Sequence, residues 1–327
     1  MKVNIKGFTT QKVGEKNSDN FDRYRYNLTN NKFAVADGVS LSFFPNIWAK
    51  LLVNNFTENY CTVLSDEIPI ELDEIQNQWE NIVKTEVDKP ETMYYVRNAY
   101  NLQKSGSATF VGLEFIQELN TIKWKSFVLG DSFLFFKSET KTEKGEISKR
   151  LCVCCRIKYF FKFTKKKNPE NKIQLTNCFR LISDKPGLPI DCPEYVNQQE
   201  GLLVISSKED LSFNNQPDYF DSKVKSPVGS PLFCEGKVTN GIFYLMTDAL
   251  ADWFLENQND ACLIISKWKN HEDFLCSVND LRLNNRLKND DTSVLILEIS
   301  EADVVDKIFY HVEYYDDIEK MIKLEKQ

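Results

Sequence analysis

Aspartates recur at or near the ends of apolar, strand-like runs along most of this chain. Strand ends hold side chains in rigid positions, and the chain has only two histidines to compete as metal ligands. A site built from carboxylates favours hard cations such as Mg²⁺ or Mn²⁺ and is typical of phosphate chemistry. The four segments are Asn17-Ser18-Asp19, Ala36-Asp37-Gly38, Thr247-Asp248-Ala249 and Asn289-Asp290-Asp291.

The expected elements come in blocks rather than in regular strand–helix alternation, which indicates an α+β layered domain instead of a doubly wound fold. Two apolar strands around Gly130-Asp131-Ser132 suggest an antiparallel sheet. Strands are expected over residues 23–28, 32–36, 110–115, 123–136, 152–163, 201–206, 241–247, 293–299 and 307–314. Helices are expected from Pro45 through residue 56, and within 70–104, 250–254 and 261–288.

Residues 137–200 differ from the rest in composition, with charged, basic and proline-rich stretches. We interpret them as a hairpin or flap inserted into one domain that spans residues 1–327. Its run Lys165-Lys166-Lys167 fits a solvated hairpin tip, or a partner contact as the alternative. The cluster Cys152, Cys154 and Cys155 fits a strand better than a zinc site, because zinc sites need two closely spaced pairs.

Composition excludes some classes of function. The net charge of -7 argues against nucleic acid or an anionic membrane as the main partner. No apolar run reaches the roughly 18 residues of a membrane span, and the polar start lacks a signal-peptide core, so we expect a cytoplasmic protein. His271 and His311 lie in no recognisable site, which disfavours Ser-His-Asp and Cys-His mechanisms.

Each aspartate also has a simpler structural explanation when it is taken alone. Asp37 suits an Asp-Gly turn, Asp248 suits a helix N-cap, and Asp290 with Asp291 suits a solvated turn. Taken together, however, the four segments indicate a metal site. Two cations held by shared carboxylates can lower the pKa of a bridging water, and the resulting hydroxide can attack phosphorus in line.

Six short motifs in order resemble those of the metal-dependent Ser/Thr protein phosphatases of type 2C, and two stretches, 33–56 and 247–255, are similar to the bacterial branch of that family. The resemblance implies a β-sandwich of two mostly antiparallel sheets flanked by helices, with metals in a cleft at one end. The motifs are Asn17-Ser18-Asp19, Asp37-Gly38, Gly106-Ser107-Ala108-Thr109, Gly130-Asp131-Ser132, Thr247-Asp248-Ala249 and Asp290-Asp291-Thr292-Ser293.

The resemblance also implies roles for single residues. Asp37 would bridge two Mn²⁺ or Mg²⁺ ions, and the Gly38 carbonyl would bind one of them. Asp248 and Asp290 would complete the coordination of the other ion. Asp19 would hold metal-bound water as a second catalytic carboxylate, and Asp131 would bind a possible third ion.

Two departures from the family pattern stand out. Ser18 occupies a position where the family often has Glu, and Gly14 lies where a phosphate-binding Arg is usual. Lys12 and Lys16 are the nearby candidates for phosphate binding, although Lys cannot reproduce the bidentate grip of Arg. The alternative is that they belong to a flexible, solvated loop.

The expected function is that of a protein serine/threonine phosphatase acting on a phosphorylated protein, with a cognate Ser/Thr kinase as its counterpart. Two alternatives remain open. One is a pseudophosphatase that uses the fold as a binding module. The other is a metal-dependent phosphohydrolase of small phosphorylated molecules.

Overall fold

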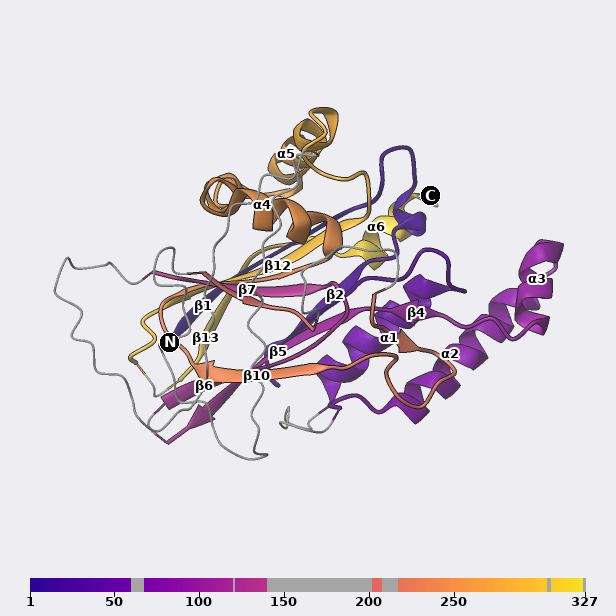
Figure 1. Cartoon of the computed structure of the whole chain (residues 1–327), viewed down its shortest axis with the longest axis horizontal. Coiled ribbons are helices and arrows are strands. Elements are labelled where there is room, and N and C mark those ends of the chain that lie inside the picture. Colours follow the sequence, from indigo (N-terminus) through magenta and orange to yellow (C-terminus); the bar gives the residue numbers. More distant parts are fainter. Residues whose placement is uncertain (60–67, 120, 140–201, 208–216, 305–306, 326–327) are drawn as a thin grey trace, which may run out of the picture.

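The computed structural model describes residues 1–59, 68–119, 121–139, 202–207, 217–304 and 307–325. They form an α+β fold in which two β-sheets pack face to face with helices on both outer faces (Figure 1). The predicted fold class, a β-sandwich of two mostly antiparallel sheets flanked by helices, is confirmed. No helix in these ranges is long and apolar enough to cross a membrane.

The larger sheet has six strands in the order β13-β1-β12-β11-β7-β8. Its pairs are antiparallel except for the parallel pair of β1 and β13. The strands are β1 (Lys2–Thr10), β7 (Phe133–Ser138), β8 (Leu202–Ile205), β11 (Gly241–Met246), β12 (Thr292–Ser300) and β13 (Phe309–Tyr315).

The smaller sheet has five strands in the order β10-β6-β5-β3-β2, and all of its pairs are antiparallel. Its strands are β2 (Arg23–Asn27), β3 (Lys32–Ala36), β5 (Phe110–Glu118), β6 (Thr121–Leu129) and β10 (Leu232–Lys237). The short strands β4 (Ser107–Ala108) and β9 (Phe220–Asp221) form a separate pair beside it.

The core between the sheets is apolar and rich in aromatic residues. Phe243 of β11 lies 5.8 Å from both Phe115 and Trp124 of the opposite sheet, measured between ring centroids. Alternate residues of each strand point into this core, as the period of two along a strand requires. This packing fixes the position of each sheet relative to the other.

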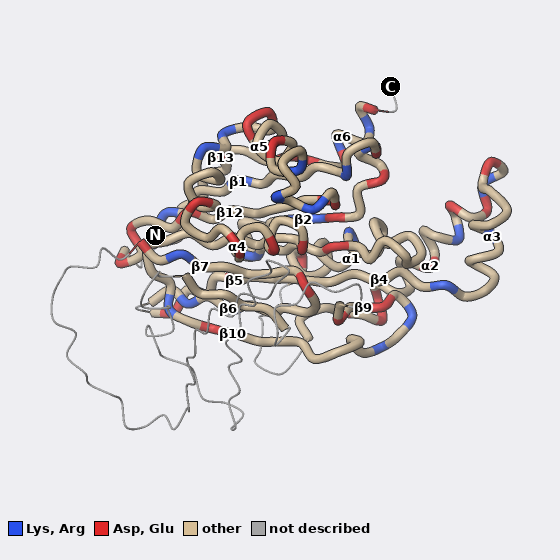
Figure 2. The backbone as a smooth tube through the Cα atoms, turned by 45° about the horizontal axis from the view of Figure 1, so that its top comes forward, with Lys and Arg blue, Asp and Glu red and all other residues tan. Residues whose placement is uncertain are grey.

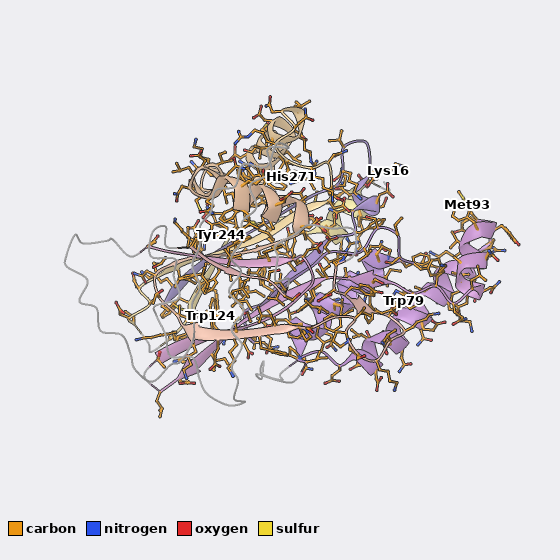
Figure 3. All side chains as sticks on the ribbon, viewed as in Figure 1. Lys16, Trp79, Met93, Trp124, Tyr244 and His271 are labelled. Carbon is orange, nitrogen blue, oxygen red and sulfur yellow. The ribbon has the colours of Figure 1, made fainter. Side chains whose placement is uncertain are left out.

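Helices cover both outer faces. Trp48 and Leu52 of α1 (Pro45–Glu58) pack against the five-stranded sheet, and α2 (Leu72–Val87), with the buried Trp79, packs against α1. The helices α4 (Asp248–Ile265) and α5 (His271–Leu283) pack against the six-stranded sheet. The helix α3 (Tyr94–Asn101) extends away from the sandwich, with Met93 at its far end, and α6 (Ile318–Glu325) lies beside the 3-10 helix η1 (Asn17–Asp19) (Figures 1 and 3).

Several expectations from the sequence need correction. The first strand, β1, and the edge strand β10 were not expected. The two strands around Gly130-Asp131-Ser132 do not pair with each other in one antiparallel sheet, because β6 and β7 belong to different sheets. The predicted helix over residues 250–254 is part of the longer α4, whose helical geometry is interrupted at Gln258.

The predicted insertion at 137–200 lies mostly outside the described residues, as do Cys152, Cys154, Cys155 and the run of three lysines. Within the described chain, Lys and Arg are interspersed with Asp and Glu along the backbone (Figure 2).

Candidate functional site

Aspartates from both sheets converge at one end of the sandwich. Asp22 directly precedes β2 and Asp37 directly follows β3, and these two strand ends meet because Arg23 pairs with Ala36. In the other sheet, Met246 of β11 pairs with Val294 of β12, so the aspartates just beyond these strand ends also meet. These are Asp248, Asp290 and Asp291.

Asp131 joins the cluster from the crossover between β6 and β7. Its carboxylate is buried and acts electrostatically on Asp37. Gly130 precedes it with a φ of 91°, in the left-handed region that favours glycine. The motifs Gly106-Ser107-Ala108-Thr109 and Gly130-Asp131-Ser132 also meet here, through a contact of 2.6 Å between the hydroxyl groups of Thr109 and Ser132.

Asp22 is the most deeply buried of these carboxylates, with 1% of its surface exposed. Its Oδ2 accepts a hydrogen bond of 3.0 Å from the Thr247 hydroxyl. Its Oδ1 has no hydrogen-bond partner within 3.5 Å among the described residues, although the Ser293 hydroxyl lies near enough to this carboxyl to oppose part of the rise in its pKa. A buried carboxylate oxygen without a partner is costly, so this atom points to a ligand that the cluster is built to receive.

Burial and mutual repulsion shift the acidity of the cluster. Burial raises the pKa of Asp22 well above its usual value, and the neighbouring Asp291 raises it further. Burial likewise raises the pKa of Asp37, and the nearby Asp22 and Asp248 add to the shift. Burial raises the pKa of Asp291 to about 6. A positive charge brought into the cluster would therefore be strongly attracted.

Two lysines already supply part of that charge. The Lys288 ammonium lies 2.7 Å from Asp290 Oδ2 and 3.3 Å from Asp248 Oδ2. The Lys12 ammonium lies 3.1 Å from Asp290 Oδ1. Burial opposes ionisation of Asp290, but Lys288 and Lys12 outweigh it and hold the pKa of that carboxyl below its usual value.

Asp291 fixes the loop that leads into the site. Its Oδ1 accepts from the Lys12 backbone N–H at 3.1 Å, and its Oδ2 accepts from the Phe21 backbone N–H at 2.8 Å. Both ends of the loop between β1 and β2 are thereby attached to the start of β12. Asp291 thus positions the loop that carries Lys12 and Asp22.

The structure brings together most of the site residues predicted from sequence. Asp131, Asp248 and Asp290 each act electrostatically on Asp37, and Asp290 also acts on Asp248. Gly38 lies in close packing, since a Cβ added there would be 2.9 Å from Pro45 Cβ. Lys12 reaches the cluster through its contact with Asp290.

Asp19 and Lys16 lie outside the aspartate cluster. Asp19 is exposed, and its carboxylate accepts a hydrogen bond of 3.1 Å from the Lys16 backbone N–H. Lys16 is also exposed, on the loop that bears η1 (Figure 3). The buried acid from this loop is Asp22, which the sequence analysis missed. Its place directly before the strand that starts at Arg23 was the available signal.

The residues present suit a divalent cation in their chemistry. Several carboxylates face one another, and Asp22 offers an unpaired buried oxygen. As the side chains are placed, however, no group of three or more His, Cys, Asp or Glu in the described part of the chain is arranged to hold a metal ion. Lysine contacts occupy both oxygens of Asp290 instead.

No protein-family model matches the chain, and no curated protein matches it. Similar solved structures are bacterial serine/threonine phosphatases. One is a bacterial serine phosphatase with 14% identity, which covers 90% of this chain and 97% of that chain at a TM-score of 0.42.

Another is the serine/threonine phosphatase Stp1 from Staphylococcus aureus, with 16% identity, 90% of this chain and 94% of that chain covered, and a TM-score of 0.42. A third is the catalytic domain of the serine threonine protein phosphatase PstP in complex with two manganese ions, with 12% identity, 91% and 99% covered, and a TM-score of 0.43. At these values the likeness assigns no role to any residue of this chain.

Proposed function

We propose that this protein is a metal-dependent serine/threonine protein phosphatase, with its catalytic centre at the aspartate cluster. The observation that carries the proposal is the convergence of buried carboxylates from both sheets, with Asp22 Oδ1 left unpaired. Such an arrangement is unfavourable unless the cluster receives positive charge.

Asp37, the Gly38 carbonyl, Asp248 and Asp290 would hold two Mn²⁺ or Mg²⁺ ions, and Asp131 a third. Cations held there would activate water for attack at phosphorus and neutralise the phosphoryl oxygens. Asp22 would orient that water through its free oxygen, the role that the sequence analysis gave to Asp19. Lys12 would bind a phosphoryl oxygen, a role supported by its ammonium group lying 3.1 Å from Asp290 Oδ1.

The substrate in this proposal is a phosphoserine or phosphothreonine side chain of a cytoplasmic bacterial protein, phosphorylated by a partner kinase. The test is release of phosphate from a phosphothreonine peptide with Mn²⁺. We expect activity that chelator abolishes and that Asp37→Asn lowers at least 100-fold, because the proposed bridging ligand is lost. Activity that survives both treatments would exclude the proposed centre.

A matched pair of variants tests which acid of the first loop takes part. Asp22→Asn and Asp19→Asn make the same chemical change, one in the cluster and one on the surface. We expect the first to lower kcat strongly and the second to leave it within about twofold, since substitutions of exposed residues away from a site are usually small in effect.

One observation favours a second candidate, a pseudophosphatase that serves as a binding module. Lys12 and Lys288 both form ion pairs with Asp290 and supply positive charge to it. A folded protein that binds no Mn²⁺ by calorimetry, yet binds a phosphoprotein, would support this alternative over the enzyme. Hydrolysis of nucleotides without hydrolysis of phosphopeptides would instead support a small-molecule phosphohydrolase.

A further inference from the structure

The two lysines at the aspartate cluster are held in different ways. The Lys288 ammonium bridges Asp248 and Asp290, which come from the ends of two neighbouring strands. Its side chain is 56% exposed, so it can turn into solvent without opening the core. Lys12 is only 19% exposed, and it also contacts the Ser40 hydroxyl at 3.2 Å and the Phe21 ring.

We propose that Lys288 is a displaceable internal counter-ion that competes with a metal ion for the Asp248–Asp290 pair. This inference rests on the proposed function, because it concerns the cations of that same centre. An ammonium group between two carboxylates satisfies the charge that a divalent cation would otherwise satisfy.

The position of Lys288 in the chain supports this role. The Asp290 backbone N–H donates to the Lys288 carbonyl at 3.0 Å, so both residues belong to one tight turn before β12. Lys288 can therefore leave Asp290 by a change of side-chain rotamer, without moving the backbone. The second observation that points to a ligand here is the unpaired oxygen of Asp22, which lies in the same cluster.

The consequence is an unequal pair of cation sites. The Asp248–Asp290 side binds only after Lys288 withdraws, whereas Lys288 contacts neither Asp22 nor Asp37 in the structure as described. Mn²⁺ should therefore bind in a tighter and a weaker step. Removing the Lys288 charge should tighten the weaker step by roughly tenfold, because it removes both the competing ion pair and the repulsion of the metal.

The experiment is titration of metal-stripped, full-length protein with Mn²⁺, followed by calorimetry and by the electron paramagnetic resonance signal of free Mn²⁺. It compares wild type with Lys288→Met, which keeps most of the aliphatic stem, and with Lys225→Met. Lys225 is a suitable control because it is 82% exposed and pairs at 3.3 Å with Asp73, outside the cluster. We expect tighter second-step binding for Lys288→Met alone.

Thermal melting in chelator adds a readout that is independent of hydrolysis. Without metal, Lys288→Met should melt at a lower temperature than wild type, because Asp248 and Asp290 lose their counter-ion. Addition of Mn²⁺ should then raise the melting temperature of Lys288→Met more than that of wild type. Unchanged or weaker second-step binding in Lys288→Met would overturn the inference while an active wild type leaves the phosphatase proposal standing. Tighter second-step binding in Lys288→Met, together with no hydrolysis by wild type, would support the inference about Lys288 and overturn the phosphatase proposal. No Mn²⁺ binding by any variant would overturn both.

Discussion

At the residue scale, the cluster is a set of carboxylates that the fold holds closer than their charges favour. Asp22 shows this best, because burial and Asp291 raise its pKa well above its usual value of 3.8. An acid with a raised pKa binds its proton more tightly in the folded chain than in the unfolded one. In metal-free protein Asp22 therefore lowers stability as the pH rises from that usual value through its folded pKa.

We predict that Asp22→Asn stabilises the metal-free protein at high pH. The amide oxygen can still accept from Thr247, and the amide N–H₂ replaces the unpaired Oδ1 with a donor. The melting temperature in chelator should rise by roughly 2–6 °C at pH 8, and the gain should shrink toward pH 4, where Asp22 is protonated. Differential scanning fluorimetry at several pH values measures this.

Asp19→Asn provides the control for that measurement, because Asp19 is exposed and the same change should produce no pH-dependent gain. A gain for Asp22→Asn that stays constant from pH 4 to 8 would contradict the assignment of the effect to ionisation.

The sequence did not show which of Asp19 and Asp22 is buried in the cluster. Asp37, Asp248 and Asp290 end or precede strongly apolar strands, so the local pattern was enough to single them out, and the structure brings them together. The loop before Arg23 contains two aspartates three residues apart, and only the attachment of its ends to Asp291 decides which one is buried. No local sequence pattern around Lys288 predicts its contact with Asp248, because that contact depends on the pairing of β11 with β12.

At the scale of elements, the site depends on connections that change sheet. The β2–β3 hairpin was predictable because it is local, with Asn30 and its neighbours in the turn. The β6–β7 connection resembles a hairpin in sequence, but its strands enter opposite sheets. Which sheet a strand joins depends on tertiary packing, which no local pattern records. This crossover carries Asp131 into the site.

Gly130 offers a test of how tightly that crossover is built. Gly130 and Gly14 both have a φ of 91°, but a Cβ at Gly130 would lie 2.4 Å from the Asp218 carbonyl, whereas a Cβ at Gly14 would meet nothing within 4 Å. We predict that Gly130→Ala costs about 3 kcal/mol or more in the free energy of unfolding, and Gly14→Ala about 1 kcal/mol. Urea denaturation of both variants in chelator gives the comparison, and equal costs would refute it.

At the scale of the whole molecule, the facing sheets are held by an aromatic core. Phe243 is fully buried and contacts Phe115 and Trp124 across the sandwich. We predict that Phe243→Ala lowers the free energy of unfolding by about 3–5 kcal/mol, because it leaves a cavity between the sheets. Phe309→Ala, on the exposed side of the edge strand β13, should cost less than about 1 kcal/mol. Chemical denaturation distinguishes the two, and a similar cost for both would contradict this account of the core.

The aspartate cluster is divided between the two sheets, with Asp22 and Asp37 on one and Asp248 and Asp290 on the other. The distances across the cluster therefore follow the spacing of the sheets. A core substitution that lets one sheet slide slightly over the other would separate the carboxylates while the chain stays folded. Hydrolysis would then fail at a lower temperature than the fold itself. An ion shared by both halves would act as a cross-link that raises this temperature, so metal supply would set the thermal range in which the protein works.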